Sequence, residues 1–227
     1  MSEQNNTFNE EGRLLQTEYA IKKVSQAGTI MGLVCTDGVV LFGLNFSKTL
    51  HKEKIYMLTP ETYCAVGGLF GDANMLIKKA RISGVRAKEW LCGESKTKFI
   101  VKSISFAQNF NTRKVNGRPY GVSFLLTGYD DKYVLYSVDP SGTINNWKAW
   151  AIGMDETAIN QTLRNEFKEE MSMEEGVVFL LSCFKKAKEV NLEMAEKMEI
   201  LLFTKEEKKF MDVSDIKQKL KDIGVKI

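Results

Sequence analysis

The chain has 227 residues, of which 32 are basic and 29 acidic, so its formal net charge is only +3. Such a small excess gives no strong field toward nucleic acid or a membrane surface, and we expect neither as a partner. There is no apolar run long enough to span a bilayer, and Met1 to Thr7 is polar rather than signal-like, which predicts a soluble intracellular protein. With only three prolines and no linker-like stretch, one domain over residues 1–227 is expected.

Cysteine and histidine usage argues against disulfide and metal chemistry. The four cysteines are far apart and form no Cys-x-x-Cys pair, so we expect reduced, buried thiols. His51 is the only histidine, which removes most zinc sites and any Ser-His-Asp arrangement within this chain. We expect no metal and no cofactor. The cysteines are Cys35, Cys64, Cys92 and Cys183.

The first predicted element is an amphipathic helix from Gly12 to about Ser25. Its apolar residues recur at helical spacing, and side chains three, four or seven positions apart lie on one face of a helix. This pattern predicts a face that docks on the rest of the protein. The expected face consists of Leu14, Ile21 and Val24, with the pair Leu15 and Tyr19 beside it.

Two strand pairs are expected next. The short apolar runs 29–34 and 39–44 are joined through Asp37-Gly38, and this is a strong hairpin signal because glycine takes the positive φ of a tight turn. The second pair comprises residues 55–58 and 63–66, around Thr59-Pro60-Glu61.

In the next two segments the apolar residues recur at the spacing of a helix. One helix is expected from Leu69 to about Trp90, and another from roughly Ser95 to Arg113. Apolar residues at spacings near four and seven predict one apolar stripe on each helix. The first stripe consists of Leu69, Ala73, Leu76 and Ala80, and the second of Phe99, Phe106 and Phe110.

The second half of the chain repeats this alternation. Strands are expected at 122–129 and 133–138, followed by two short strands that flank Asn145-Asn146 and end near Ile152. Two helices follow, at about 155–168 and 173–190. A last strand at 197–204 precedes a C-terminal helix with Val213, Ile216, Leu220 and Ile223 on one side.

The order of elements predicts an α+β fold. Each helix pair has one apolar stripe, and the strands are apolar on nearly both faces. Two antiparallel sheets packed together, with helices covering each outer face, satisfy this pattern. Periodicity alone leaves several α+β arrangements open.

Short motifs give a more specific signal. Residues 12–20 read Gly-Arg-Leu-Leu-Gln-Thr-Glu-Tyr-Ala, and they begin four residues after Phe8. Residues 117–123 read Gly-Arg-Pro-Tyr-Gly-Val-Ser, and residues 139–142 read Asp-Pro-Ser-Gly. Taken singly, these are a docking helix, a loop entering a strand and a tight turn. Together with Asp72-Ala73, Lys148-Ala149 and Ile152-Gly153 in this order, they closely resemble the proteasome alpha-type subunits, which build the outer rings of the 20S particle.

The resemblance extends from Phe8 to about Thr204 and implies the four-layer αββα sandwich of the Ntn-hydrolase type. It divides the chain into an N-terminal gate tail (1–9), a ring-contact helix (10–26) and the sandwich (27–227). Within the family the chain is most similar to the alpha type-4 group, third in the alpha ring. That likeness rests on the segments 27–29, 53–56, 72–74, 147–149 and 195–197.

The chain also departs from the family pattern. No Tyr-Asp pair precedes Phe8, and Asn9-Glu10 replace the usual Ser-Pro, which leaves the geometry of a closed gate open. The connection between Asn45 and Lys54 is shorter than in relatives, and a long charged C-terminal tail is not expected. These differences indicate a compact, divergent member.

One alternative is a self-processing threonine peptidase. Catalytic beta subunits of this fold cut a Gly-Thr bond in themselves, and Gly28-Thr29 is similar to that bond. Two differences argue against it, since Gly38 lies one residue closer to Thr29 than in catalytic subunits and Leu44 replaces their aspartate. No carboxylate occurs from Val39 to Lys52, although Lys54 matches their lysine. We therefore expect no catalytic residue.

The resemblance gives Lys54 a different role. In alpha subunits the equivalent lysine lines a pocket between adjacent subunits and meets the C-terminal carboxylate of activators, such as the tails of regulatory-particle ATPases. Gly28 and Leu69 match other positions near this pocket. Without the resemblance, Lys54 would be read as an ordinary surface lysine.

The leading hypothesis is a non-catalytic structural and gating subunit of the outer ring, acting in ATP- and ubiquitin-dependent protein degradation. Its implied partners are other alpha subunits, beta subunits and activators, and its implied location is the cytoplasm and nucleus. A stand-alone sandwich domain that self-associates through its first helix remains a further alternative. The implied gate and ring-contact residues are Phe8, Gly12, Arg13, Gln16, Glu18 and Tyr19.

Overall fold

The computed structural model describes residues 6–45, 54–91, 96–114 and 116–225. Of the predicted features, residues 1–5 of the tail, His51, Glu53 and Cys92 lie outside these ranges. The helices are α1 (Leu15–Ser25), α2 (Phe70–Leu91), α3 (Thr97–Arg113), α4 (Glu156–Glu166), α5 (Met173–Ala187) and α6 (Val213–Asp222), with a short 3₁₀ helix η1 (Leu192–Lys197). The strands are β1 (Ile30–Val34), β2 (Val39–Leu44), β3 (Ile55–Thr59), β4 (Thr62–Gly68), β5 (Val122–Tyr129), β6 (Tyr133–Val138), β7 (Ile144–Trp147), β8 (Ala149–Ile152), β9 (Met198–Phe203) and β10 (Lys208–Phe210).

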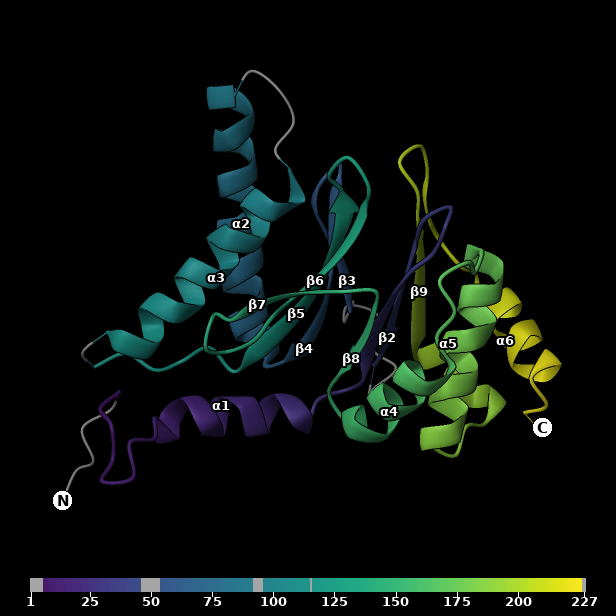
Figure 1. The fold of residues 1–227 in the computed structure, drawn as a ribbon, viewed down its shortest axis with the longest axis horizontal. Coiled ribbons are helices and arrows are strands. Elements are labelled where there is room, and N and C mark those ends of the chain that lie inside the picture. Colours follow the sequence, from purple (N-terminus) through teal and green to yellow (C-terminus); the bar gives the residue numbers. More distant parts are fainter. Residues whose placement is uncertain (1–5, 46–53, 92–95, 115, 226–227) are drawn as a thin grey trace.

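The strands form two five-stranded antiparallel sheets, in the orders β10-β9-β2-β1-β8 and β3-β4-β5-β6-β7. Figure 1 shows the sheets side by side in the middle of the molecule, with α2 and α3 outside one sheet and α4, α5 and α6 outside the other. α1 extends along one end of these layers, against β4 and β5. This arrangement confirms the predicted αββα sandwich.

The sheet-to-sheet contact explains why β1 and β2 are apolar throughout. Successive side chains of a strand point to opposite faces, so a strand between two layers buries both sets. Ile30 and Leu41 belong to the cluster between the sheets, where they join Leu125 of β5. Met31 and Phe42, one position along each strand, belong instead to the cluster beneath the α4–α6 layer.

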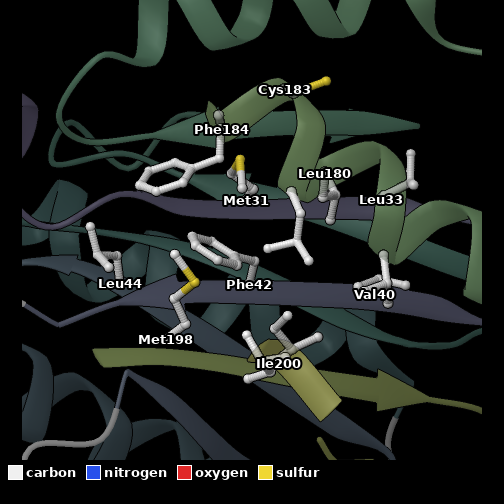
Figure 2. Packing of buried hydrophobic residues seen from close by; sticks show 14 of the residues in the cluster. Met31, Leu33, Val40, Phe42, Leu44, Leu180, Cys183, Phe184, Met198 and Ile200 are labelled. Atoms are coloured by element: carbon white, nitrogen blue, oxygen red, sulfur yellow. The ribbon is translucent and has the colours of Figure 1, made fainter. Parts of the chain in front are cut away.

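The two outer clusters attach the helices to the sheets. Figure 2 shows Phe184 of α5 beside Phe42 of β2, and their ring centroids are 5.3 Å apart. On the opposite side of the sandwich, Leu76 of α2 and Ile104 of α3 pack with Phe124 of β5. Each layer interface therefore has its own apolar cluster.

Local signals account for several element ends. α5 begins at a capping box, in which the Ser172 hydroxyl accepts from the Glu175 amide and the Glu175 carboxylate accepts from the Ser172 amide. In the predicted turn 139–142, Oδ1 of Asp139 accepts from the Ser141 amide at 2.9 Å, and the chain closes through Gly142 at φ +87°.

The β1–β2 hairpin is confirmed, but the predicted role of its glycine is wrong. Val34 pairs with Val39 at the end of the ladder. Gly38 is not among the glycines with positive φ. A Cβ at this position would lie 2.5 Å from the carbonyl oxygen of Phe203 and would press against Met173, so the glycine is required by the close approach of two neighbouring segments.

The first helix differs from the prediction at its start and in its buried face. Gly12 lies in a turn, and α1 begins three residues later at Leu15. Val24 is buried as expected, but Tyr19 and Ile21 are 55% and 43% exposed. The buried stripe is Thr17, Ala20 and Val24, because small side chains let α1 lie close to the sheet.

The phenylalanine stripe of α3 faces outward, contrary to the inward face expected for a covering helix. Phe99, Phe106 and Phe110 are 45%, 69% and 50% exposed. A different stripe packs on the sheet, and it includes the buried polar residue Gln108, whose Nε2 donates to the Val122 carbonyl at 2.7 Å. On α2 the predicted Ala73, Leu76 and Ala80 are buried, whereas Leu69 is 38% exposed and precedes the helix.

Short elements in the second half account for the remaining differences. Asn145 and Asn146 lie within β7, and Lys148 is the residue that separates β7 from β8. η1 and β10 were not predicted, because each is short and polar. In α6 Ile216 and Leu220 are buried as expected, whereas Val213 is 39% exposed and Ile223 lies at the end of the helix.

Cys35, Cys64 and Cys183 are buried free thiols, as predicted. Burial raises the pKa of Cys35 and of Cys183 to about 12, which keeps both thiols protonated near neutral pH. No helix in the described residues is long and apolar enough to cross a membrane. Across the same ranges, no group of acidic, cysteine and histidine side chains is arranged to hold a metal ion.

The two phenylalanine environments give a direct test of the fold. Phe184→Ala should lower the free energy of unfolding by about 3–5 kcal/mol, because it leaves a cavity beneath α5. Phe106→Ala should change it by less than about 0.5 kcal/mol, because that ring is already in solvent. Urea titrations of both variants measure the difference, and similar losses would contradict the outward placement of Phe106.

Candidate functional site

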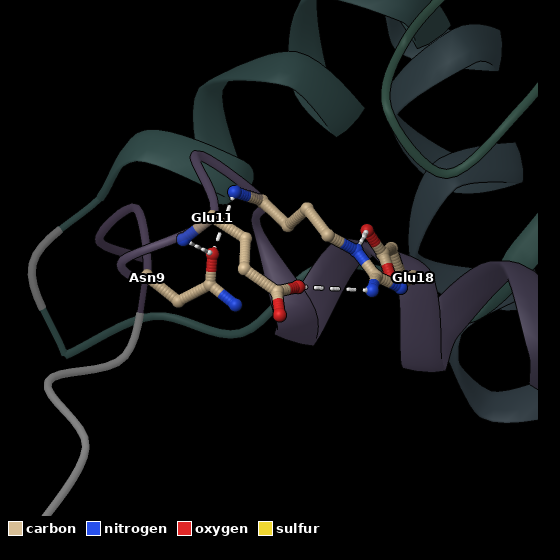
Figure 3. Close-up of polar contacts among 4 residues, drawn as sticks. Asn9, Glu11 and Glu18 are labelled. Atoms are coloured by element: carbon tan, nitrogen blue, oxygen red, sulfur yellow. Dashed lines mark hydrogen bonds and ion pairs between the residues drawn. The ribbon is translucent and has the colours of Figure 1, made fainter.

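An ordered turn precedes α1. Oδ1 of Asn9 accepts hydrogen bonds from the amides of Glu11 and Arg13 at 3.1 and 2.8 Å, as Figure 3 shows. The Asn9 amide in turn donates to the Arg13 carbonyl at 3.0 Å. Gly12 has φ +74°, in the left-handed region that favours glycine. The glycine of the N-terminal motif therefore has a backbone role.

Two predicted ring-contact residues, Arg13 and Glu18, form an ion pair that joins this turn to α1. Nε of Arg13 donates to Oε1 of Glu18 at 2.8 Å, and Nη2 donates to the other carboxylate oxygen. The hydrogen bond from Arg13 lowers the pKa of Glu18, and Glu18 raises that of Arg13. Exposed ion pairs add little stability, so the pair mainly fixes the direction in which the chain enters the helix.

The aromatic members of the predicted set point outward. Phe8 is 71% exposed and Tyr19 is 55% exposed, while Gln16 is half-buried. The structure therefore does not gather the predicted residues into one cluster: it pairs Arg13 with Glu18 and leaves Phe8 and Tyr19 in solvent.

Asn6 is a further contact of the tail that the sequence did not reveal. Its Nδ2 group donates to the carbonyl oxygens of Asn111, Lys114 and Gly117 at 3.3, 2.9 and 3.1 Å. Residues at the end of a helix have carbonyls without intrahelical partners, and the Asn6 amide satisfies them at the end of α3. The segment immediately before Phe8 is thereby attached to α3.

The side chain of Lys54 points inward and contacts the backbone. An ordinary surface lysine would instead extend into water. Its ammonium donates to the carbonyl oxygens of Gly28 and Val66 at 3.3 and 3.1 Å, so two of its three donors are used within the described residues. Burial lowers the pKa of Lys54 to about 8, and the nearby Glu199 opposes part of this shift. A nearby anion would stabilise the charged form of this partly buried ammonium, so the site favours binding of an anionic group.

The structure brings Gly28 and Lys54 together. A Cβ at Gly28 would overlap the carbonyl oxygen of Leu44 and lie 3.3 Å from Cε of Lys54. Leu69, the third predicted pocket residue, directly follows β4, the strand that contains Val66. Its side chain lies over Gly121, where a Cβ would come within 3.0 Å of it.

Glu199 of β9 also belongs to this region and was missed. Its carboxylate accepts from Nδ2 of Asn45 at 2.6 Å, and from the amides of Lys54 and Ile55 at 2.8 and 3.1 Å. It thus holds both ends of the connection that precedes β3. A lone glutamate in the apolar run of residues 198–203 is the signal that could have identified it.

Asp72 joins two of the sequence motifs. Its carboxylate accepts two hydrogen bonds from the Arg118 guanidinium, both at 2.7 Å, and one from the Gly121 amide at 2.9 Å. Burial tends to raise the pKa of Asp72, but the hydrogen bonds from Arg118 and Gly121 outweigh this effect and the pKa is lowered. The start of α2, beside Leu69, is thereby fixed to the loop that enters β5.

Thr29, the nucleophile of the alternative hypothesis, is buried. Its side chain donates to the Met154 carbonyl at 2.9 Å, and its carbonyl accepts from the Leu44 amide at 2.8 Å. Leu44 is 2% exposed and belongs to an apolar cluster, in the place where the alternative requires an aspartate. The position of the required aspartate therefore holds an apolar side chain, which can neither orient the Thr29 hydroxyl nor change its pKa.

Two packed sheets between helical layers, with an ordered segment ahead of the first strand, agree with the fold expected of a proteasome subunit. The sequence profile of the family described as proteasome subunit matches residues 24–201. The chain is 44% identical over 224 residues to "Probable proteasome subunit alpha type-3" of Encephalitozoon cuniculi (strain GB-M1), covering 97% of both chains. This chain belongs to the proteasome subunit family.

Further relatives specify the type of subunit. The chain is 35% identical over 201 residues to "Proteasome subunit alpha type-4" of Spinacia oleracea, covering 85% of this chain and 80% of the relative. It is 33% identical over 207 residues to "Probable proteasome subunit alpha type-3" of Schizosaccharomyces pombe, covering 88% and 84%. The protein is an alpha-type subunit of type 3 or type 4, which confirms the predicted resemblance.

The Asp72 network can be tested through its dependence on pH. Asp72→Asn should lower the free energy of unfolding at pH 7 by about 1–3 kcal/mol, because the Arg118 contacts lose their charged acceptor. The ordinary pKa of an aspartate is 3.8, and that of Asp72 is lowered in the folded state. Such a carboxylate stabilises the protein at pH values above 3.8, and this contribution is lost as the pH falls through the folded-state pKa. The difference in free energy of unfolding between the variant and the wild type should therefore be smaller at pH 3 than at pH 7.

Urea titrations at pH 7 and pH 3 measure this gap. Asp215→Asn, an exposed position in the first turn of α6, is the control and should change the free energy of unfolding by less than about 0.5 kcal/mol at either pH. A gap for Asp72→Asn that stays constant between the two pH values would show that its carboxylate does not titrate below its ordinary range.

Proposed function

We propose that this chain is a non-catalytic structural and gating subunit of the outer ring of the 20S proteasome. The observation that supports it most directly is the ordered segment of residues 6–14, which precedes α1 and carries the exposed Phe8. A catalytic subunit of this fold needs a free threonine at the start of its first strand, whereas Thr29 is buried and bonded to Met154. The sequence division into tail, ring-contact helix and sandwich is part of the proposal.

Gating is proposed to act through the N-terminal tail, residues 1–9. Tails with few apolar residues become ordered when neighbouring chains supply contacts. A gate can open when such tails change from an ordered to a disordered state. Asn6 supports this view because it gives the tail a defined point of attachment on α3. Phe8 and Tyr19 then remain free to contact the adjacent subunits of the ring.

Contact with the inner ring of beta subunits is proposed for the outer face of α2 and α3. Eight large apolar side chains on these helices are exposed, whereas α4 and α5 expose none within the described residues. Exposed large apolar side chains gathered on two neighbouring helices are typical of a protein interface. We call this surface the α2–α3 face; its members are Phe70, Met75, Ile82, Val85, Trp90, Phe99, Phe106 and Phe110.

Activator docking is proposed at Lys54. The ammonium is half-buried, bonded only to uncharged carbonyl groups among the described residues, and near Gly28, which allows backbone to approach closely. Glu199 already lies near the ammonium, and a terminal carboxylate would add a charged hydrogen-bond acceptor. Such a contact contributes about 1.5–3 kcal/mol where water is largely excluded. The tails of regulatory ATPases are the proposed source of that carboxylate.

Isolation of the native species tests the main proposal. The full-length chain, captured from its own cells, should be found in a particle with many related subunits, and intact mass should show no cleavage before Thr29. A chain that begins at Thr29 would instead support the peptidase. A small species without family members would support the stand-alone domain, and either result would contradict a structural role in the ring. Cytoplasm and nucleus are the proposed locations, which fluorescence imaging of the tagged chain would check.

Lys54→Ala should weaken the docking of regulatory ATPases to assembled particles by roughly 10- to 150-fold without impairing ring assembly. For wild type, affinity should also decline as the pH rises through about 8, because the free ammonium then loses its proton. The variant should lack this decline. Lys186→Ala on α5, which removes an exposed lysine, is the control. Unchanged affinity in Lys54→Ala would contradict the proposed role of Lys54.

A further inference from the structure

A small apolar pocket opens between the C-terminal half of α2 and the turn that joins β3 to β4. Its volume is about 260 Å³, and its walls are mainly apolar. We call it the α2 socket. It is lined by Met57, Leu58, Thr59 and Pro60 on the strand side and by Gly84 and Val85 on the helix side.

Gly84, which lies in the interior of α2, is part of the helix wall of the socket. Glycine is unfavourable at such a position, so its presence needs a packing reason. A Cβ at Gly84 would lie 2.6 Å from Cγ2 of Thr59, which shows how closely the helix approaches the end of β3. The glycine thus sets the close spacing of the helix wall and the strand wall of the socket.

One polar contact fixes the two walls relative to each other. Nε and Nη2 of Arg81 both donate to the carbonyl oxygen of Met57, at 3.0 and 2.8 Å. The guanidinium is thereby held across the edge of the socket. Its geometry is set by backbone and helix, so the socket is formed before anything binds.

The mouth of the socket is apolar and its rim is basic. Met57 and Val85 are 49% and 60% exposed. Arg81 and Lys88 both line the socket, and neither makes an ion pair within the part of the chain that the structure describes. Glu61, the carboxylate of the lining, is paired with Lys208 at 3.5 Å. The charge left at the rim is positive.

This combination selects the occupant. A volume of about 260 Å³ accommodates one large apolar side chain, and a basic rim attracts a carboxylate beside it. Val85 lies one helical turn from Ile82, so the socket is continuous with the exposed α2–α3 face.

We propose that the α2 socket receives one large apolar side chain of an inner-ring subunit, and that a carboxylate about one helical turn away on that subunit contacts Lys88 or Arg81. This inference rests on the proposed contact of the α2–α3 face with the inner ring. It adds a specific anchor to that contact, because a filled pocket with a charged neighbour fixes register as well as affinity.

Two substitutions in this subunit test the anchor without entering its core. Val85→Asp places a charge at the mouth, and Lys88→Glu reverses the charge of the rim; both positions are exposed on α2. Each variant is co-expressed with the other subunits of its own particle. The amount of inner-ring subunit that co-purifies with it, measured by native mass spectrometry, should fall at least tenfold.

Matched controls separate the anchor from general effects. Arg86→Glu makes the same charge reversal two residues from Lys88 but outside the socket lining, and Val213→Asp repeats the apolar-to-acidic change on α6. Both should recover as much inner-ring subunit as wild type. Loss in Arg86→Glu equal to that in Lys88→Glu would overturn the socket, since the effect would then be one of net charge.

Phe106→Asp distinguishes failure of the socket from failure of the larger proposal. If Phe106→Asp loses the inner-ring subunits while Val85→Asp and Lys88→Glu retain them, the socket is wrong and the α2–α3 face stands. If all three retain them, the proposed face is wrong as well. Should Val85→Asp fail to fold, as judged by circular dichroism, Lys88→Glu decides the outcome alone.

Discussion

Burial of β1 and β2 on both faces is the constraint on which the rest of the structure depends. One set of their side chains meets the second sheet and the other needs a cover of helices, so neither sheet can exist without three further layers. The chain satisfies this requirement with α4 to α6 on one side and α2 with α3 on the other. This constraint does not determine which side chains the outer helices expose to solvent, and the two sides of the sandwich differ in this respect. Only the α2–α3 side exposes a row of large apolar residues among the described positions.

A second principle organises the ends of the sandwich. The side chains of Asn6, Lys54, Asp72 and Glu199 each bind backbone groups of a segment distant in sequence. Such contacts hold connections that apolar packing cannot hold, because loops carry backbone groups in need of partners. They occur where the tail meets α3, where Lys54 meets Gly28, and where α2 begins, which are the regions to which the proposed gate and activator functions are assigned.

Much of the fold follows from periodicity, and the exceptions have physical causes. The paired helices were predicted because their apolar spacing reflects one buried side, and the hairpin and the central strands because they are short apolar runs bounded by turn residues. The phenylalanines of α3 were misplaced because a stripe of apolar residues shows that something covers it, but not whether the cover belongs to the same chain. The inward direction of Lys54 and the contacts of Asn6 and Glu199 could not be predicted, since their partners are backbone groups that only the folded chain brings near. Arg13 and Glu18 were named from the sequence only as ring-contact residues, and their ion pair appears in the structure.

The carboxylate of Glu199 has a consequence for how this family can vary. It binds Asn45 on one side of the β2–β3 connection and Lys54 with Ile55 on the other, so the two strand ends are fastened from β9. The entropic cost of a longer connection grows only slowly with its length once the ends are fixed. Insertions and deletions between positions 45 and 54 can therefore accumulate during evolution without altering the register of either strand, and a short connection in one lineage requires no compensating change in the sheets.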